Sequence, residues 1–344
     1  MSNPIAGLRS AMVLLVLTLV STACLRAGVG PPGSLIASPS GDTLHVRAGA
    51  LPGGGGSPGA PFPSLQAAVE AAQPGDTILV SAGVYPGSTE TVRSGTSDRP
   101  IMVRGVPGAL LAGDDTGPVI TVRHSHIVIE GLVITDANKL ILLEGASSVV
   151  IRQNHLRTAD GECVRIRQGS RHNIVERNRI EGCGRLDFRL LQNNKNGEGV
   201  YIGSAPETLP AGSLDLSSDN TVVGNVIDSP AECVDVKEGS DNNRVMDNLC
   251  TGNLDRAGAA ISVRSGDNVI EANQLTRNRS AGIRLGGDGP ADGVNNTVRY
   301  NWVNHNEGYG VKVVRVPQLA VCGNDVRHNR LGAATLGVEP AMPC

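Results

Sequence analysis

A short motif recurs along most of the chain at intervals of 23 to 28 residues. In each copy, a run of Val or Ile residues is followed a few positions later by an asparagine. The copies place this residue at Asn154, Asn178, Asn225, Asn248, Asn273, Asn301 and Asn324. The longer interval of 47 residues, from Asn178 to Asn225, is one repeat plus a large insertion. A repeat this short cannot bury an apolar face alone and must stack on its neighbours.

The residue pattern inside each repeat favours β-strands. Apolar and polar residues alternate, and the short runs are rich in β-branched residues. Each strand then pairs with its counterpart one repeat along, about 4.8 Å away, which builds a right-handed parallel β-helix with a narrow core. The asparagines would stack as a ladder in the turns, with adjacent glycines supplying positive φ. We therefore expect a single all-β solenoid domain over residues 42–344.

Both ends of such a solenoid must be covered, because they expose unpaired strands and core residues. Residues 64–72 have helical spacing, with Ser64 as a candidate N-cap and Pro74-Gly75 as a stop. This pattern predicts a short N-terminal capping helix. We expect the C-terminal tail, residues 331–344, to cover the other end.

The composition restricts both the core and the partners. Lys and Arg number 30 and Asp and Glu 33, so the net charge is only −3 and lacks the basic excess of a nucleic-acid binder. Aromatic residues make up 2% of the chain, so the core must be built from Val, Ile, Leu and Ala. We expect a monomer with no nucleic-acid partner.

The N-terminus has the features of an export signal. Arg9 precedes an apolar run from Ala11 to Val20, which is too short to span a membrane. Small residues follow up to Ala23, which predicts a signal peptide over residues 1–23 and a flexible tether over 24–41. Cys24 resembles the cysteine of a bacterial lipobox. Two locations therefore stay open: free in the extracellular or periplasmic space, or lipid-anchored to the cell envelope through Cys24.

Six cysteines remain after Cys24, an even number that suits disulfides in an oxidising compartment. Sequential pairing would close three loops of about one repeat each and is the pairing we favour over buried free thiols. The expected pairs are Cys163–Cys183, Cys233–Cys250 and Cys322–Cys344. The chain has no CxxC motif, so a zinc site is not expected.

One face of the predicted solenoid gathers charge. If Val and Ile point inward, the alternate residues of successive strands form an outward column. That column holds Arg165, Tyr201, Asp235, Ser262, Arg284 and Lys312, with Arg167, Lys237 and Arg264 beside it. Glu162, Glu198 and Glu232 precede three successive strands, where stacked carboxylates would repel one another unless a cation joins them. Insertions over residues 184–197 and 203–218 would wall this place.

Two stretches resemble known families. The segments Ala60–Val69, Gln73–Thr77 and Ala82–Tyr85 are similar to the opening of exported, pectate-lyase-like β-helix proteins. The segments Glu232–Ser240 and Ser262–Asn268 resemble the polysaccharide lyase family that includes alginate lyases and chondroitinase B. The chain departs from that family by having Pro230 in place of a second glutamate.

The second resemblance implies a site and a reaction. Lys237 would be the base, Arg264 the acid or charge stabiliser, and Glu198, Glu232 and Asp235 would be calcium ligands. The reaction would be β-elimination, in which a base removes the C5 proton of a uronic acid and a metal stabilises the charge that develops on the carboxylate. Asp235 and Glu238 beside Lys237 would raise its pKa unless calcium holds them.

The outward cations suit an acidic polysaccharide, because arginines bind carboxylates in bidentate fashion. The expected substrate-binding residues are Arg165, Arg167, Tyr201, Arg284 and Lys312. A non-catalytic, glycan-binding β-helix is the main alternative to a lyase. A glycoside hydrolase is a third reading, in which Glu198, Glu232 and Asp235 would supply the paired carboxylates.

Overall fold

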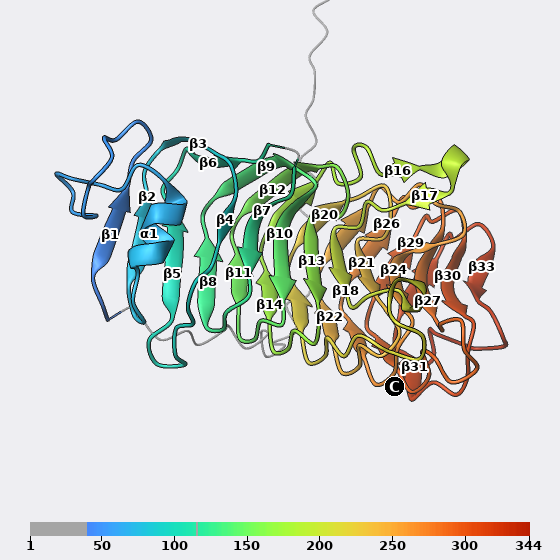
Figure 1. Cartoon of the computed structure of the whole chain (residues 1–344). Helices are drawn as coiled ribbons and strands as arrows, with labels where there is room; N and C mark the ends of the chain where they lie inside the picture. Colours follow the sequence, from blue (N-terminus) through green and yellow to red (C-terminus); the bar gives the residue numbers. More distant parts are fainter. Residues whose placement is uncertain (1–39, 115) are drawn as a thin grey trace, which may run out of the picture. The chain divides into compact units, whose positions relative to one another are not determined.

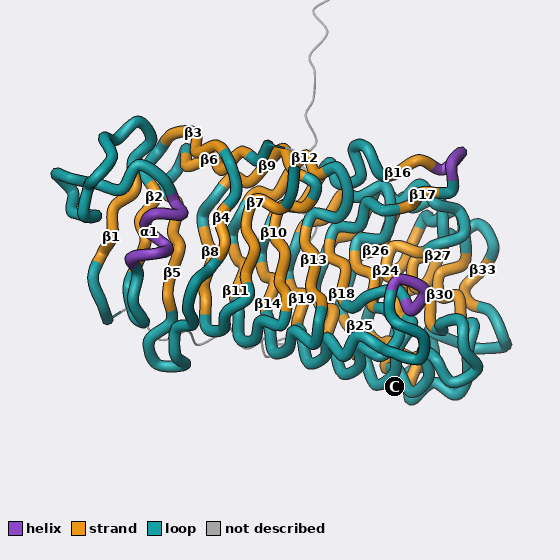
Figure 2. Tube along the Cα trace, in the orientation of Figure 1, coloured by secondary structure: helices purple, strands orange, loops and turns teal. Residues whose placement is uncertain are grey.

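The computed structural model describes residues 40–114 and 116–344. The predicted signal peptide, nearly all of the tether and the lipidation candidate Cys24 lie outside these residues. The described part is a parallel β-solenoid, in which the chain winds repeatedly through three sheets (Figure 1; Figure 2). No helix in the described part is long and apolar enough to cross a membrane.

The first sheet, called sheet A, has 11 strands. They are β1 (Thr43–Val46), β2 (Thr77–Val80), β5 (Ile101–Gly105), β8 (Ile127–Glu130), β11 (Val150–Arg152), β14 (Ile174–Glu176), β19 (Thr221–Val223), β22 (Arg244–Met246), β25 (Val269–Glu271), β28 (Thr297–Arg299) and β31 (Ala320–Cys322).

The second sheet, called sheet B, has ten strands and carries the charged face. They are β4 (Thr89–Glu90), β7 (Pro118–Val122), β10 (Lys139–Glu144), β13 (Val164–Arg167), β18 (Val200–Ile202), β21 (Val234–Val236), β24 (Ala259–Val263), β27 (Ala281–Leu285), β30 (Tyr309–Val313) and β33 (Gly332–Ala334).

The third sheet, called sheet C, also has ten strands. They are β3 (Gly83–Pro86), β6 (Ala109–Ala112), β9 (Val133–Ala137), β12 (His155–Ala159), β15 (Arg179–Glu181), β20 (Val226–Asp228), β23 (Leu249–Thr251), β26 (Gln274–Thr276), β29 (Trp302–Asn304) and β32 (Asp325–Arg327). The first insertion forms a hairpin of β16 (Phe188–Arg189) and β17 (Asn194–Lys195) around the 3-10 turn η1 (Leu190–Gln192), and the second contains η2 (Pro206–Thr208).

The core between the sheets is aliphatic, as the composition requires. Most strands turn Val, Ile or Leu inward, and residues such as Ile151, Leu156 and Ile166 are fully buried. The helix α1 (Leu65–Ala71) confirms the predicted cap, because Ser64 Oγ accepts a hydrogen bond from the Ala67 amide and Leu65 and Ala68 are buried. The C-terminal tail also folds back on the last coil, where the Asn324 amide donates to the Pro340 carbonyl.

The asparagine ladder is present. From Asn154 to Asn324, each side-chain amide donates to the Oδ1 of the next asparagine at 2.9–3.1 Å, and each also donates to a backbone carbonyl of the coil before. The residue before each asparagine has positive φ, but glycine supplies it only at Gly224 and Gly323. Gln153, Arg177 and Ala272 adopt the same left-handed conformation. The ladder's hydrogen bonds therefore offset a backbone cost that we expected glycine to avoid.

Two more ladders were not anticipated from the sequence. One runs through Asn173, Asn220, Asn243, Asn268 and Asn296, and the other through Asn253, Asn278, Asn306 and Asn329. Both satisfy backbone groups in buried turns, where an unpaired polar group would be costly.

Two of the three expected disulfides form, Cys163–Cys183 and Cys322–Cys344. The expected Cys233–Cys250 bond is wrong, since both residues are buried free thiols. Burial, together with a hydrogen bond to Cys250, raises the pKa of the Cys233 thiol. Because the thiolate is the reactive form, this environment keeps Cys233 unreactive.

Asn248→Ala should destabilise the solenoid strongly. Asn248 Oδ1 accepts from both the amide and the side chain of Asn225, and its Nδ2 donates to Val222, Met246 and Asn273. Leaving these groups buried and unpaired should lower the free energy of unfolding by at least about 2 kcal/mol, measured by urea denaturation. Gln274→Ala, an exposed change on the next coil, is the control, and an equal effect in both variants would contradict the role of the ladder.

Candidate functional site

The strand register of sheet B confirms the predicted outward column. Arg165 pairs with Tyr201, Tyr201 with Asp235, Asp235 with Ser262, and the series continues through Arg284 to Lys312. The six residues lie on β13, β18, β21, β24, β27 and β30, one on each successive coil. Parallel in-register pairing thus brings residues up to 147 positions apart in sequence onto one face.

Two further rows flank this column. Lys237 and Arg264 follow β21 and β24, and their amides donate to Ile202 and Val236 of the preceding coils at 2.9 and 2.8 Å. They therefore occupy equivalent positions on adjacent coils. Glu162, Glu198 and Glu232 form the opposite row, since the Cys163 amide donates to the Glu198 carbonyl and the Gly199 amide to that of Glu232, both at 3.0 Å.

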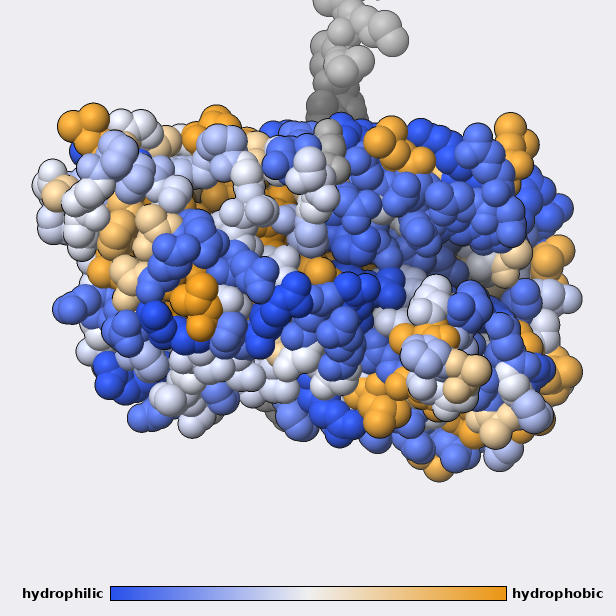
Figure 3. Space-filling view, viewed as in Figure 1, coloured by the Kyte–Doolittle hydropathy of each residue, from blue (hydrophilic) through white to orange (hydrophobic). Residues whose placement is uncertain are grey.

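These rows form the floor of a groove of about 490 Å³. Its walls come from residues 193–196 of the first insertion, from Ala205, Glu207 and Thr208 of the second, and from Asp255, Ala257 and Gly258. The floor residues are Glu162, Arg165, Glu198, Tyr201, Glu232, Asp235, Lys237 and Arg264. Hydrophilic side chains cover much of this face of the solenoid (Figure 3). The insertions thus lie where the sequence placed them, beside the charged column.

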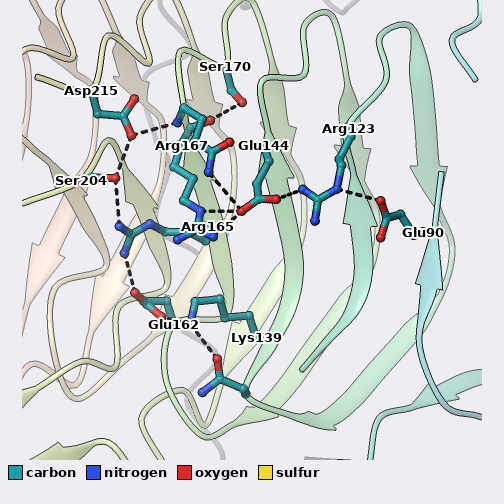
Figure 4. Close-up of polar contacts among 12 residues, drawn as sticks. Glu90, Arg123, Lys139, Glu144, Glu162, Arg165, Arg167, Ser170, Ser204 and Asp215 are labelled. Carbon is teal, nitrogen blue, oxygen red and sulfur yellow. Dashed lines mark hydrogen bonds and ion pairs between the residues drawn. The ribbon is translucent and has the colours of Figure 1, made fainter. Parts of the chain in front are cut away.

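Tyr201 lies on the groove floor and contacts two cations. The Arg165 guanidinium lies 3.7 Å from the ring centroid, and Lys237 Nζ lies 4.9 Å from it. Arg165 is fixed in turn by Glu162 at 2.6 Å and by Ser204 at 3.4 Å (Figure 4). Burial raises the pKa of the Tyr201 phenol, although Lys237 and Arg165 act in the opposite direction.

Lys237 is held by Asp235, with 2.8 Å between Nζ and Oδ2. Burial lowers the pKa of Lys237, but Asp235 and then Tyr201 outweigh it and raise the pKa overall. Burial likewise opposes the charged form of Asp235, whose pKa is nevertheless lowered by Lys237 and Arg264. Lys237 is therefore an ammonium ion in the ligand-free protein, as its acidic neighbours predicted.

Arg264 lies among three acidic groups without a close hydrogen bond to any of them. Its guanidinium is 3.9 Å from Asp235 and from Glu238, and 3.5 Å from the exposed Asp288. Its Nε is buried without a hydrogen-bond partner among the described residues. Arg264 thus lines the groove and keeps one unpaired donor, its buried Nε.

Glu198, Glu232 and Asp235 form a buried carboxylate cluster, whose nearest oxygen atoms all lie within 4.8 Å of one another. Burial raises the pKa of Glu198 to about 8, with further contributions from Glu162 and Glu232. Burial and Asp235 raise the pKa of Glu232 to about 7. Glu162 differs, because Lys139 and Arg165 overcome its burial and lower its pKa.

The cluster fits the calcium site implied by the sequence resemblance. Asp235 Oδ1 is buried and accepts no hydrogen bond from the described residues. Carboxylate oxygen atoms are the ligands that hard divalent cations prefer, and three carboxylates here each offer one within 4.8 Å of the others. Glu198, Glu232 and Asp235 are therefore the residues that would hold such an ion.

The remaining predicted binding residues lie outside this groove. Arg167 on β13 donates to Glu144 of the preceding coil at 2.8 Å and does not line the groove (Figure 4). Arg284 and Lys312 continue the column toward the C-terminal coils and do not line the groove.

Asp215, which the sequence reasoning missed, anchors the second insertion. Its carboxylate accepts hydrogen bonds from the Gln168 and Gly169 amides at 2.9 and 3.0 Å and from the Ser217 hydroxyl. It also accepts one from the Ser204 hydroxyl (Figure 4). Ser204 also contacts Arg165, so this loop is linked to the groove floor. No periodic signal marks Asp215, because it lies within an insertion and not in a repeat.

The metal-free protein should lose stability as the pH rises from 5 to 8. In this range the folded protein retains the protons on Glu198 and Glu232, whose pKa values are about 8 and 7, while the unfolded chain has already released them. The native state binds more protons, so its stability falls with rising pH. Urea denaturation in chelator should show this slope in the wild type and a shallower slope in Glu198→Gln, and identical slopes would contradict the assignment.

Comparisons with known proteins agree with this architecture. The family described as the right-handed β-helix region matches residues 197–337. A comparison with curated proteins gives no match. The crystal structure of an alginate lyase from Paenibacillus sp. str. FPU-7 superposes with a TM-score of 0.67 at 23% identity, covering 85% of this chain and 98% of that one.

Two other lyase structures are also similar. Pectate lyase Pel9A gives a TM-score of 0.62 at 15% identity and covers 88% of this chain and 81% of its own. A mannuronic acid specific polysaccharide family 6 lyase from human gut microbiota gives 0.53 at 18% identity, covering 74% and 60%. The chain is thus a right-handed parallel β-helix that resembles polysaccharide lyases in fold.

Proposed function

We propose that the groove binds an acidic, uronate-containing polysaccharide and cleaves it by β-elimination. The observation that carries the proposal is the juxtaposition of Lys237, Arg264 and a buried carboxylate cluster on three adjacent coils of one groove. The fold is also shared with an alginate lyase, a pectate lyase and a mannuronic acid specific lyase, all of which are named for polyuronate substrates.

The reaction makes specific demands on the site. A base removes the proton from C5 of the uronate, the electron pair forms the C4–C5 double bond, and the C4–O bond breaks as the leaving oxygen takes up a proton. Lys237 is the candidate base and Arg264 the candidate group that stabilises the charge developing on the uronate carboxylate. A calcium ion, when bound, would add Lewis-acid stabilisation of the same charge.

Base catalysis requires that Lys237 lose its proton, which its ion pair with Asp235 opposes. Asp235 belongs to the carboxylate cluster as well as to this pair. When Asp235 serves as a metal ligand, it no longer favours the ammonium form, and the burial of Lys237 lowers the lysine pKa. The arrangement therefore supports Lys237 as a base in the metal-loaded protein.

Export is part of the proposal. The two disulfides among the described residues suit an oxidising compartment, and large polysaccharides are encountered outside the cytoplasm. We propose an extracellular or periplasmic location, with lipidation of Cys24 as the alternative form. Mass spectrometry of the N-terminus from a membrane fraction would distinguish a diacylated Cys24 from a cleaved, unmodified chain.

Unsaturated uronate absorbs in the ultraviolet, so the reaction can be followed directly with alginate, pectate and chondroitin sulfate. The wild type should produce this absorbance on at least one polymer, and Lys237→Ala should lower the rate about 100-fold or more. Arg327→Gln, an exposed change on β32, is the control and should leave the rate unchanged. A flat trace on all three polymers would contradict the lyase and favour a glycan-binding protein.

Calcium binding can be measured without substrate. Calcium at a concentration of 100 Kd should stabilise the folded wild type by about 2.7 kcal/mol. The midpoint of its thermal unfolding should rise accordingly. Glu198→Gln and Glu232→Gln should remove this shift, whereas Glu70→Gln, an exposed change on α1, should preserve it. An unchanged shift in the two cluster variants would exclude the cluster as the calcium site.

A further inference from the structure

The charged face of sheet B differs between its two ends. On the N-terminal coils, four cations of the face have carboxylate partners. Arg123 contacts Glu90 and Glu144, Arg167 contacts Glu144, and Lys139 and Arg165 contact Glu162 (Figure 4). These pairs form a nearly continuous chain from β4 to β13. These cations are neutralised by carboxylates of the protein, so this end of the face does not require an anionic ligand.

The C-terminal coils lack this neutralisation. Arg284 on β27 and Lys312 on β30 are paired in register, so the two cations lie on adjacent coils of the same column. Neither has an ion pair or a side-chain hydrogen bond with any residue of 40–114 or 116–344. Arg264 lies on the coil before Arg284 and leaves its own Nε unpaired. Arg264, Arg284 and Lys312 therefore lie on three successive coils, and neither Arg284 nor Lys312 forms an ion pair with a described carboxylate.

Arg284 carries the stronger sign of a missing partner. Its NH1 nitrogen is buried and has no acceptor within the described residues. A buried donor without an acceptor is costly, and such groups in native proteins call for a bound ion, water or ligand. Burial and the proximity of Arg264 lower the pKa of Arg284 and outweigh the opposing effect of Asp235, Asp288 and Glu232, none of which forms an ion pair with it. Burial and Arg284 likewise lower the pKa of Lys312 and outweigh Asp255. An anion between the two side chains would remove both the repulsion and the unpaired donor.

We propose that Arg284 and Lys312 form an anion subsite that extends the groove toward the C-terminal coils and binds a second acidic group of the substrate chain. This inference rests on the proposed function for the identity of the groove. The ligand group is a carboxylate or a sulfate ester, because both offer the paired oxygen atoms that a guanidinium binds. The substrate must then be charged at the sugar over β27 and β30, whereas a neutral sugar is tolerated over β10 and β13.

The test measures polymer binding separately from turnover. Binding is measured by affinity electrophoresis in gels containing alginate, which carries only carboxylates, dextran sulfate, which carries only sulfates, or neutral dextran. The variant Arg284→Gln/Lys312→Gln is compared with Arg179→Gln/Arg327→Gln, which removes two exposed cations from sheet C. The ultraviolet assay is run on the same proteins.

The double variant in the subsite should weaken the Kd for one charged polymer at least about tenfold, as expected for the loss of a charge-assisted hydrogen bond. The control should change the Kd less than twofold, and neutral dextran should not bind. Stronger retardation by alginate identifies a carboxylate ligand, and by dextran sulfate a sulfate. Arg284→Lys/Lys312→Arg should restore part of the affinity, since it keeps both charges.

Equal weakening in both double variants would reduce the effect to net charge and overturn the subsite, as would wild-type binding in the subsite variant. Failure to bind either charged polymer would overturn it too. If subsite-dependent binding occurs without any ultraviolet product, the subsite stands and the lyase proposal fails. If product forms with an unchanged KM in the subsite variant, the lyase stands and the subsite fails.

Discussion

Each coil of the solenoid is held to the next by parallel strand pairing in all three sheets and by asparagine side chains that bond to their counterparts in the turns. This coil-to-coil registration determines everything else about the molecule. It fixes which residue lies above which, because a shift of one position would move inward residues to the surface. The ladders also hold non-glycine residues such as Arg177 and Ala272 in the left-handed conformation. The site exists because the register is exact along sheet B.

Because of this registration, acidic and basic side chains lie close together in a buried site. Glu198, Glu232 and Asp235 are buried together, and Lys237 and Arg264 lie against them. The pKa values reflect this crowding. Glu198 and Glu232 hold protons near neutral pH, whereas Asp235 keeps Lys237 charged. Perturbations of this kind in a walled groove are characteristic of functional sites. A divalent cation would remove the repulsion among the carboxylates and would bind Asp235, which then no longer favours the ammonium form of Lys237.

The two ends of the same face differ in how their cations are neutralised. Ion pairs neutralise the cations from β4 to β13, whereas Arg284 and Lys312 on β27 and β30 have no partners in the described structure. A solenoid is well suited to such a gradient, since each coil contributes one residue per column and can be changed almost independently of the others. The groove therefore lies at the boundary between a neutralised half and a cationic half.

The sequence by itself determined the fold and the composition of the site. A repeat of 23 to 28 residues built from β-branched runs and asparagines predicted the solenoid, and the alternation of residues placed Arg165 through Lys312 in a single column. The insertions and the two flanking rows also followed from alignment of the repeats. These features depend on local periodicity, which is why they can be read before the structure is known.

Only the tertiary structure decided which charges are paired. Arg167 resembles Arg165 in sequence, but it reaches back to Glu144 and leaves the groove. Cys233 and Cys250 have the spacing of a disulfide yet lie in the core as thiols. Asp215 and the partner of Arg165 at Ser204 come from a loop without a repeat. These pairings depend on side-chain direction, burial and contacts between coils, and the repeat pattern of the sequence contains no information on them.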